Sequence, residues 1–106
     1  MQAPILRSMR TPCVYLLASR RLGTIYCGVT SDLVRRAWEH RCDFVAGFTR
    51  AYGVHRLVWY ELHGSMYEAI SREKRIKEWQ RAWKVELIEA TNPGWVDLYP
   101  LLSPLD

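Results

Sequence analysis

The sequence predicts an α+β domain in which a small three-stranded antiparallel sheet is flanked by helices. Three observations predict this class. Runs rich in β-branched and aromatic residues at 13–18, 24–30 and 56–62 are typical of strands, and three other segments carry apolar residues at helical spacing. The resulting order, β-β-α-β-α-α, favours a sheet packed against helices. With 106 residues, the chain has room for one domain of about 100–150 residues.

The first half of the predicted fold is a hairpin followed by a helix. A short loop that ends at Gly23 joins the two hairpin strands. Ser31 or Asp32 supplies an N-cap for a helix that continues to about Arg41. Residues 42–55 carry two glycines and several polar groups, so we expect a loop there.

The second half contains the third strand and two helices. Ser65 and Glu68 have the spacing of a capping box, which opens a helix ending near Gln80. Residues 82–90 have apolar side chains at helical spacing and form the last predicted helix. The sequence Asn-Pro-Gly at 92–94 ends that helix.

We expect the folded domain to span residues 12–95, between tails at 1–11 and 96–106. The longest uncharged apolar run, 13–19, is far shorter than the ~20 residues of a membrane helix. The N-terminal tail has no apolar signal core. These features predict a soluble cytoplasmic protein with no membrane partner. Three widely spaced cysteines without a Cys-x-x-Cys pair argue against a zinc site or a disulfide framework.

Positive charge is concentrated in the N-terminal part of the chain. The net charge is +4, but residues 1–60 carry nine Lys and Arg against three Asp and Glu, whereas residues 61–106 carry six against eight. Arginine outnumbers lysine twelve to three, which suits bidentate contacts with phosphate. A GC-rich genome would give the same bias, so charge alone leaves nucleic-acid binding undecided.

Glu73 lies within the apolar stripe of the helix that follows Ser65, at a position where leucine would pack. One interpretation is a helix rolled slightly, so that Glu73 pairs with Lys77 four residues later. The other is a partly buried carboxylate that faces a cleft and holds a divalent cation.

Two pairs of side chains suggest phosphate chemistry. Arg36 and His40 share one helix face, where they either bind a phosphate or form a solvated edge. Tyr15 and Tyr26 lie in the hairpin strands, where their phenols either meet in a site or simply pack well. Gly28, just before the helix cap, indicates a bend in the backbone or the close approach of a ligand.

Taken in the order of the chain, these residues resemble the motifs of the GIY-YIG nuclease superfamily. Residues 13–15 (CVY) stand at its first tripeptide and residues 26–28 (YCG) at its second. Arg36 follows the motif glycine by eight residues, and His40 comes four later. Residues 69–73 resemble the helix that carries the superfamily's metal-binding glutamate.

The resemblance covers residues 12–99 and is closest to small stand-alone bacterial members of the YhbQ type, through segments 28–33, 72–77 and 92–99. It also adds Asn92 as a match to the last motif residue, although the Asn-Pro-Gly turn gives Asn92 a structural explanation too. Where some members carry a lysine after the motif glycine, this chain has Val29. That departure implies weaker activity or different positioning of the phosphate.

The resemblance implies metal-dependent hydrolysis of phosphodiester bonds. Tyr26 would act as general base, and Glu73 would hold a single Mg²⁺ or Mn²⁺ ion. Arg36 would stabilise the developing negative charge. Tyr15 and His40 would orient the water or the base through hydrogen bonds.

Five further arginines are candidates for contacts with flanking phosphates: Arg20, Arg21, Arg35, Arg41 and Arg50. The favoured hypothesis is a DNA endonuclease of repair or recombination. A catalytically weak nucleic-acid-binding module that acts with a partner is the main alternative, and RNA is an alternative substrate. The sequence does not distinguish a monomer from a homodimer.

Overall fold

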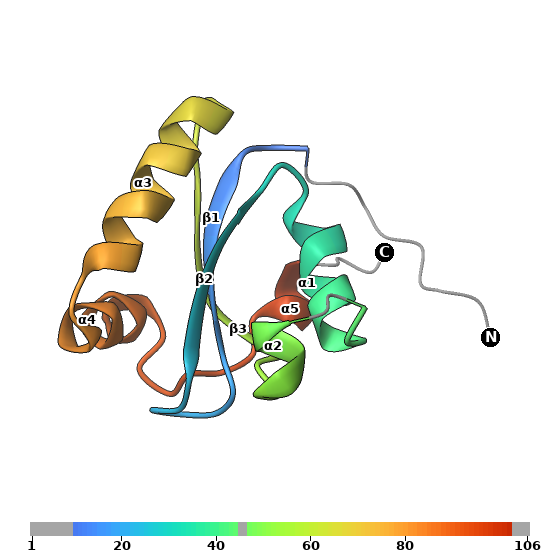
Figure 1. Ribbon diagram of the computed structural model, residues 1–106, viewed down its shortest axis with the longest axis vertical. Helices are drawn as coiled ribbons and strands as arrows, with labels where there is room; N and C mark the ends of the chain where they lie inside the picture. Colours follow the sequence, from blue (N-terminus) through green and yellow to red (C-terminus); the bar gives the residue numbers. More distant parts are fainter. Residues whose placement is uncertain (1–9, 45–46, 103–106) are drawn as a thin grey trace.

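A computed structural model describes residues 10–44 and 47–102 of the chain. It confirms the predicted fold class, a three-stranded antiparallel sheet flanked by helices in an α+β arrangement (Figure 1). The elements in chain order are β1 (Cys13–Ala18), β2 (Ile25–Thr30), α1 (Leu33–Arg41), α2 (Phe48–Ala51), β3 (Arg56–Leu62), α3 (Met66–Glu78), α4 (Arg81–Thr91) and α5 (Tyr99–Leu102).

The sheet has the strand order β2-β1-β3, so β1 is central and β2 and β3 are its edges. Both pairings are antiparallel, and Tyr15 in β1 lies between Gly28 of β2 and Tyr60 of β3. All six residues of β1 are buried, because helices cover both faces of the sheet. The residues of β2 are mostly half-buried, as expected for an edge strand.

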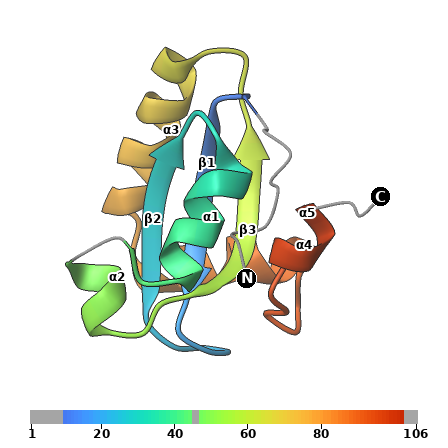
Figure 2. The same ribbon diagram turned by 90° about the vertical axis from the view of Figure 1, so that its right-hand side faces the viewer.

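Alternation along β1 divides the core into two layers. Val14 and Leu16 pack on the side of α3 and α4, in a cluster with Ile76. Tyr15 and Leu17 pack on the opposite side, in a cluster that includes residues of α1 and α5. Figure 2 shows α1 in front of the sheet, with α2 beside the β2 end and α5 beside β3.

Local capping explains where two helices begin. Of the two candidates before α1, Asp32 is the N-cap, and its side chain accepts a hydrogen bond from the amide of Arg35. Before α3, the Ser65 hydroxyl accepts a hydrogen bond from the Glu68 amide at 3.2 Å. These caps place Arg36 and Glu73 in the second turns of their helices or beyond.

The structure differs from the predicted loop at 42–55, because this segment contains the short helix α2. α2 begins after Gly47, whose φ of 101° suits glycine, and has only four residues. So short a helix has no apolar periodicity to reveal it. Beyond the predicted boundary at 95, the Leu98 amide donates a hydrogen bond to the Leu57 carbonyl, and Leu102 is buried on the α1 side.

In the two described stretches, 10–44 and 47–102, no helix combines the length and the apolarity that a membrane crossing requires.

Candidate active site

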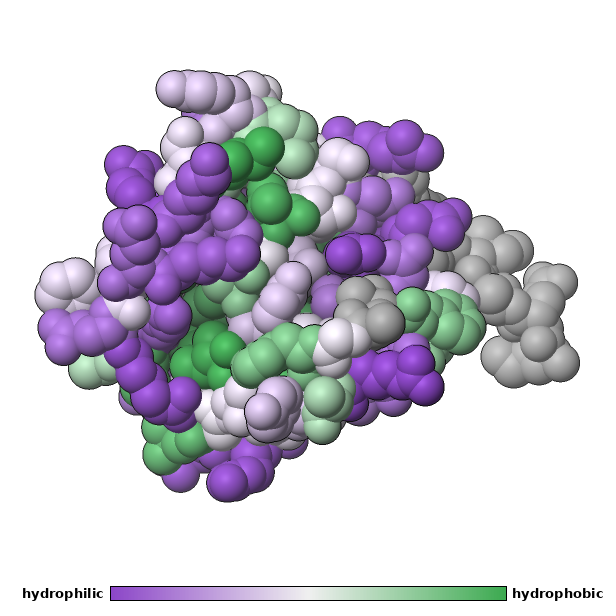
Figure 3. Space-filling view, in the orientation of Figure 1, coloured by the Kyte–Doolittle hydropathy of each residue, from purple (hydrophilic) through white to green (hydrophobic). Residues whose placement is uncertain are grey.

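The candidate residues gather along the edge strand β2. α3 covers one face of the sheet beside this strand, and α1 and α2 cover the other (Figure 1). In the same view, Figure 3 shows a strip of residues of intermediate to high hydropathy, coloured white to green, between two hydrophilic flanks. Side chains from opposite faces of the sheet therefore reach the same edge.

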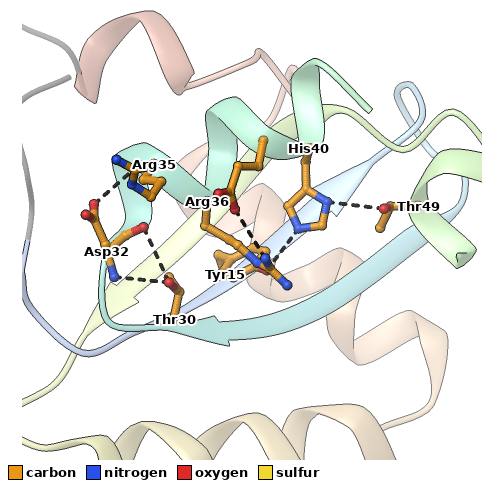
Figure 4. A network of polar contacts seen from close by, with 8 residues as sticks. Tyr15, Thr30, Asp32, Arg35, Arg36, His40 and Thr49 are labelled. Atoms are coloured by element: carbon orange, nitrogen blue, oxygen red, sulfur yellow. Dashed lines mark hydrogen bonds and ion pairs between the residues drawn. The ribbon is translucent and has the colours of Figure 1, made fainter. Parts of the chain in front are cut away.

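A buried chain of polar contacts connects β1, α1 and α2 on one side of this edge (Figure 4). The Tyr15 hydroxyl lies 3.1 Å from Nε2 of His40, and Nδ1 of His40 lies 3.2 Å from Oγ1 of Thr49. All three residues are at most 3% exposed. Thr49 is not among the residues predicted from the sequence, because the short helix α2 that carries it was not predicted.

Burial keeps the Tyr15 phenol and the His40 imidazole neutral. Loss of hydration raises the pKa of Tyr15 far above its usual value. Burial, with the charge of Arg36 in addition, lowers the pKa of His40 to about 4. Because both ring nitrogens of His40 contact Tyr15 and Thr49, the ring does not form the predicted solvated edge.

Arg36 lies at the boundary between this buried chain and solvent. Its guanidinium is beside the Tyr15 hydroxyl, and its Nη1 lies 3.2 Å from Oε1 of Glu39. Burial acts to lower the pKa of Arg36, but the hydrogen bonds to Tyr15 and Glu39 outweigh it and raise the pKa. The side chain is 38% exposed and lines a cleft of about 370 Å³ between the end of β2 and the start of α1.

Tyr26 is the half-buried tyrosine of the site. Its ring centre lies 6.4 Å from that of Tyr15 and 5.6 Å from that of His40, so the two tyrosines do come together. On the α2 side, it stacks on Phe48 with the ring centres 6.2 Å apart. Aromatic neighbours thus fix the Tyr26 ring at the surface, whereas Tyr15 lies beneath it.

The close approach predicted at Gly28 comes from the protein itself. A Cβ atom at this position would lie 2.5 Å from the ring and hydroxyl of Tyr15, its cross-strand partner. Any side chain here would displace Tyr15. Gly28 is therefore required for the placement of a site residue.

On the α3 side, Glu73 is both largely buried and paired with Lys77, which were alternative interpretations of the sequence. It is only 7% exposed, and its Oε2 lies 2.7 Å from Nζ of Lys77. The hydrogen bond to Glu73 raises the pKa of Lys77. Lys77 also interacts electrostatically with Tyr26 and Cys27, so this ion pair borders the same edge strand.

The residues present fit a divalent cation held by few protein ligands. Glu73 offers one carboxylate, a hard oxygen ligand, and its Oε2 is shared with Lys77. Within the described part of the chain, no group of three or more His, Cys, Asp or Glu side chains forms a metal cage. Mg²⁺ commonly binds through one carboxylate, water and substrate phosphate, which is the donor set that Glu73 allows.

The five arginines proposed for flanking phosphates are not equivalent. Arg35 lines the cleft beside Arg36, and Arg50 is exposed on α2. Arg20 and Arg21 are exposed in the turn between β1 and β2. Arg41 instead pairs with Asp97, and its guanidinium lies 4.8 Å from the centre of the Tyr99 ring. Arg41 therefore holds the C-terminal segment.

Asn92 lies at the C-terminal end of α4, on the side of β3. Its Nδ2 donates hydrogen bonds to the carbonyls of Val58 and Val96, at 3.1 and 2.8 Å. Its Oδ1 accepts a hydrogen bond from the Val96 amide at 3.0 Å. The side chain is 6% exposed, so these contacts support the structural explanation of the Asn-Pro-Gly turn.

Tyr15 of β1, Tyr26 of β2 and Arg36 and His40 of α1 come together as one candidate site in this α+β domain. The chain belongs to the GIY-YIG family, because the family profile described as the GIY-YIG catalytic domain matches residues 11–86. The resemblance seen in the sequence is thereby confirmed.

Similar proteins include small UPF0213 proteins of bacteria and archaea. The chain is 36% identical over 67 residues to one from Bacillus pumilus, covering 63% of this chain and 68% of that protein. It is 42% identical over 65 residues to one from Halobacterium salinarum, with 61% and 84% covered. The solution NMR structure of the UPF0213 protein BH0048 from Bacillus halodurans matches with a TM-score of 0.52 at 29% identity, covering 89% and 99% of the two chains.

Proposed function

We propose that this protein is a metal-dependent endonuclease that hydrolyses phosphodiester bonds of DNA, in repair or recombination. The observation that carries the proposal is the position of Tyr26. Its ring lies at the surface of β2, next to the buried Tyr15 and His40 and within the electrostatic reach of Lys77. Arg36 borders the same site from α1.

In the proposed reaction, a water oxygen bonds to phosphorus while the bond from phosphorus to the 3′ oxygen breaks. The Tyr26 phenolate accepts the proton of the water as general base. Arg36 stabilises the negative charge that develops on the phosphoryl oxygens. Glu73 would hold a divalent cation, which supplies Lewis-acid stabilisation of the phosphate and the leaving oxygen when bound.

Tyr15 and His40 act beneath this surface as positioning residues. The Tyr15 hydroxyl contacts both Arg36 and His40, so its place determines where the guanidinium lies. Gly28 supports the arrangement by leaving room for the Tyr15 ring. Hydrogen bonds among buried groups of this kind maintain the geometry that a phosphoryl transfer needs.

Exposed arginines near the site would contact flanking phosphates. Arg35 lies in the cleft next to Arg36, and Arg50 is on the helix that packs on Tyr26. The hairpin turn adds Arg20 and Arg21 at one end of β2. Such contacts provide affinity that falls with salt concentration, without choice of sequence.

Two observations favour a second candidate function, a catalytically weak nucleic-acid-binding module that acts with a partner. Lys77 is already paired with the Glu73 carboxylate, so a cation must compete with an internal ammonium group. Val29 also stands where some members of the superfamily have a lysine. Both features reduce the activity expected of the isolated chain.

Cleavage of labelled DNA distinguishes these candidates. Single-stranded, duplex, flapped and branched DNA, with matched RNA, are incubated with Mg²⁺, Mn²⁺ or EDTA. Wild type is compared with Glu73→Gln, Tyr26→Phe and the control Glu78→Gln, which changes an exposed carboxylate of the same helix. We expect metal-dependent cutting of DNA that the first two variants lose and the control retains.

A wild-type protein that binds DNA but cuts under no metal condition would instead support the binding module. Cutting of RNA in preference to DNA would correct the substrate. Cutting in EDTA that survives Glu73→Gln would contradict metal dependence.

A further inference from the structure

α2 contributes a buried hydroxyl to the site through Thr49. This residue is 3% exposed although its helix has only four residues and its neighbours Phe48 and Arg50 are exposed. The Thr49 carbonyl also accepts a hydrogen bond from the Val54 amide at 2.8 Å, which ties the end of α2 to the core. The Oγ1 atom is thus held at a fixed place, 3.2 Å from Nδ1 of His40.

The neighbours of Tyr15 decide the direction of the hydrogen bonds. Burial keeps the Tyr15 phenol protonated, so its proton needs an acceptor. Among residues 10–44 and 47–102, the polar groups that contact its oxygen are the Arg36 guanidinium and Nε2 of His40. A guanidinium has no acceptor, so Tyr15 donates to Nε2 of His40 and accepts from Arg36.

This direction determines the tautomer of His40. The imidazole is neutral at pH 7, because burial opposes its protonation. With Nε2 acting as acceptor, the single ring proton lies on Nδ1. The Nδ1–H group then donates to Oγ1 of Thr49, the atom that faces it at 3.2 Å. Hydrogen bonds therefore run from Arg36 through Tyr15 and His40 to Thr49.

We propose that Thr49 is a positioning residue for phosphodiester hydrolysis: its hydroxyl accepts a hydrogen bond from Nδ1–H of His40 and thereby stabilises the tautomer that holds Tyr15 and Arg36 in place. This proposal rests on the proposed nuclease function. Without the hydroxyl, Nδ1–H is buried with no acceptor. In the other tautomer, Nε2–H and Arg36 both donate to the Tyr15 oxygen, and the Tyr15 proton has no acceptor. Both tautomers then leave a buried donor unpaired, so the preference for Nδ1–H weakens.

Two variants test the role of the hydroxyl. Thr49→Val keeps the size and branching of the side chain but removes the hydroxyl, and Thr49→Ser keeps the hydroxyl. Thr91→Val, at an exposed threonine of α4, is the matched control. Each protein is studied by nitrogen NMR of the histidine rings, which identifies the protonated nitrogen, and by cleavage kinetics with Mg²⁺ on the DNA that wild type cuts best.

We expect His40 to carry its proton on Nδ1 in wild type, Thr49→Ser and Thr91→Val. In Thr49→Val, a second population with the proton on Nε2 should appear, and kcat should fall about tenfold or more while KM stays within about twofold, as for one lost hydrogen bond to the site. Thr49→Ser should keep kcat within about threefold of wild type.

Protonation of Nε2 in wild-type His40 would overturn the proposal, and so would an equal kcat in Thr49→Val and Thr49→Ser. If Thr49→Val does not fold, the wild-type tautomer and the Thr49→Ser kinetics still decide the question. The nuclease function fails separately: a wild type with Nδ1–H on His40 that cuts no substrate would overturn that function and leave the hydrogen-bond assignment supported.

Discussion

The two edges of the sheet differ in how their polar groups are used. Along β3, the C-terminal segment closes the edge: Oδ1 of Asp97 accepts from the Leu57 amide, and the Leu98 amide donates to the Leu57 carbonyl. Asn92 binds the Val58 carbonyl of the same strand. Along β2, no further strand pairs with the outer side in the described part of the chain, and Tyr26 stays half-buried.

The chain's own C-terminal segment covers the β3 edge, whereas the proposed chemistry lies at the β2 edge. An open edge strand is a liability unless it is covered, and β3 is covered by the chain's own C-terminal segment. The β2 edge carries aromatic and charged side chains from both faces of the sheet instead. We therefore expect changes at the β2 edge to affect catalysis and changes at the β3 edge to affect stability alone.

A single added carbon on β2 should give the largest effect. Gly28→Ala places a Cβ 2.5 Å from the Tyr15 ring, so we expect a loss of about 3 kcal/mol in the free energy of unfolding and a large fall in kcat. The matched control is Gly94→Ala after α4, where the nearest atom would lie at an ordinary 3.6 Å. For each variant, urea unfolding measures the free energy of unfolding and cleavage kinetics measure kcat. Equal stability of the two variants would contradict the close approach.

The buried His40 should make stability depend on pH. Its pKa is lowered to about 4 by burial, with a contribution from Arg36 that Glu39 partly opposes, whereas an unfolded histidine titrates near 6.5. Between these values, the unfolded chain binds more protons, so stability falls as the pH falls from about 6.5 to about 4, by about 2–3 kcal/mol.

Urea unfolding of wild type and His40→Gln across this pH range checks the effect. The difference between the two proteins should shrink toward low pH. Parallel pH profiles would show that His40 is not the buried neutral group described.

On the other edge, Asn92→Ala should cost about 2 kcal/mol in stability, because three hydrogen bonds to Val58 and Val96 are lost. The kcat of the folded variant should remain at the wild-type value. Thermal unfolding and kinetics on the same sample separate the two effects. A fall in kcat at unchanged stability would move Asn92 into the site, as the resemblance to the superfamily implies.

The smallest effects should separate two arginines of α1. Arg35→Ala should weaken DNA binding and reduce the slope of log K against log salt by about one, with stability within about 0.5 kcal/mol of wild type. Arg41→Ala should lower stability, because it releases Asp97 and Tyr99, and leave the salt slope unchanged. Salt-dependent binding titrations check both, and an equal slope change in the two variants would show that Arg41 also contacts phosphate.

Structural features that depend on a few neighbouring residues could be predicted from the sequence. The three strands, the Asp32 and Ser65 caps and the end of α4 each follow from patterns within a few residues, and the structure confirms them. Motif order also identified the family. Local patterns did not reveal α2, because four residues cannot show helical periodicity.

The sequence predicted candidate residues that the structure brings together at Tyr15, Tyr26, Arg36 and His40, but it did not predict their partners. The need for Gly28 follows from its register opposite Tyr15, which is a long-range pairing. Likewise, the hydroxyl of Thr49 reaches His40 only through the packing of α2. The catalytic roles assigned to Tyr26, Arg36 and Glu73 remain predictions.

The most direct test of an active site on the β2 edge is to locate a bound Mn²⁺ ion by paramagnetic broadening of backbone amide signals. The protein is titrated with Mn²⁺ in the presence of a short DNA oligonucleotide, beside Glu73→Gln. We expect broadening that is strongest near Glu73 and Tyr26, weaker at Tyr60 on β3, and lost in the variant. Broadening that persists in Glu73→Gln, or that centres on β3, would contradict the account.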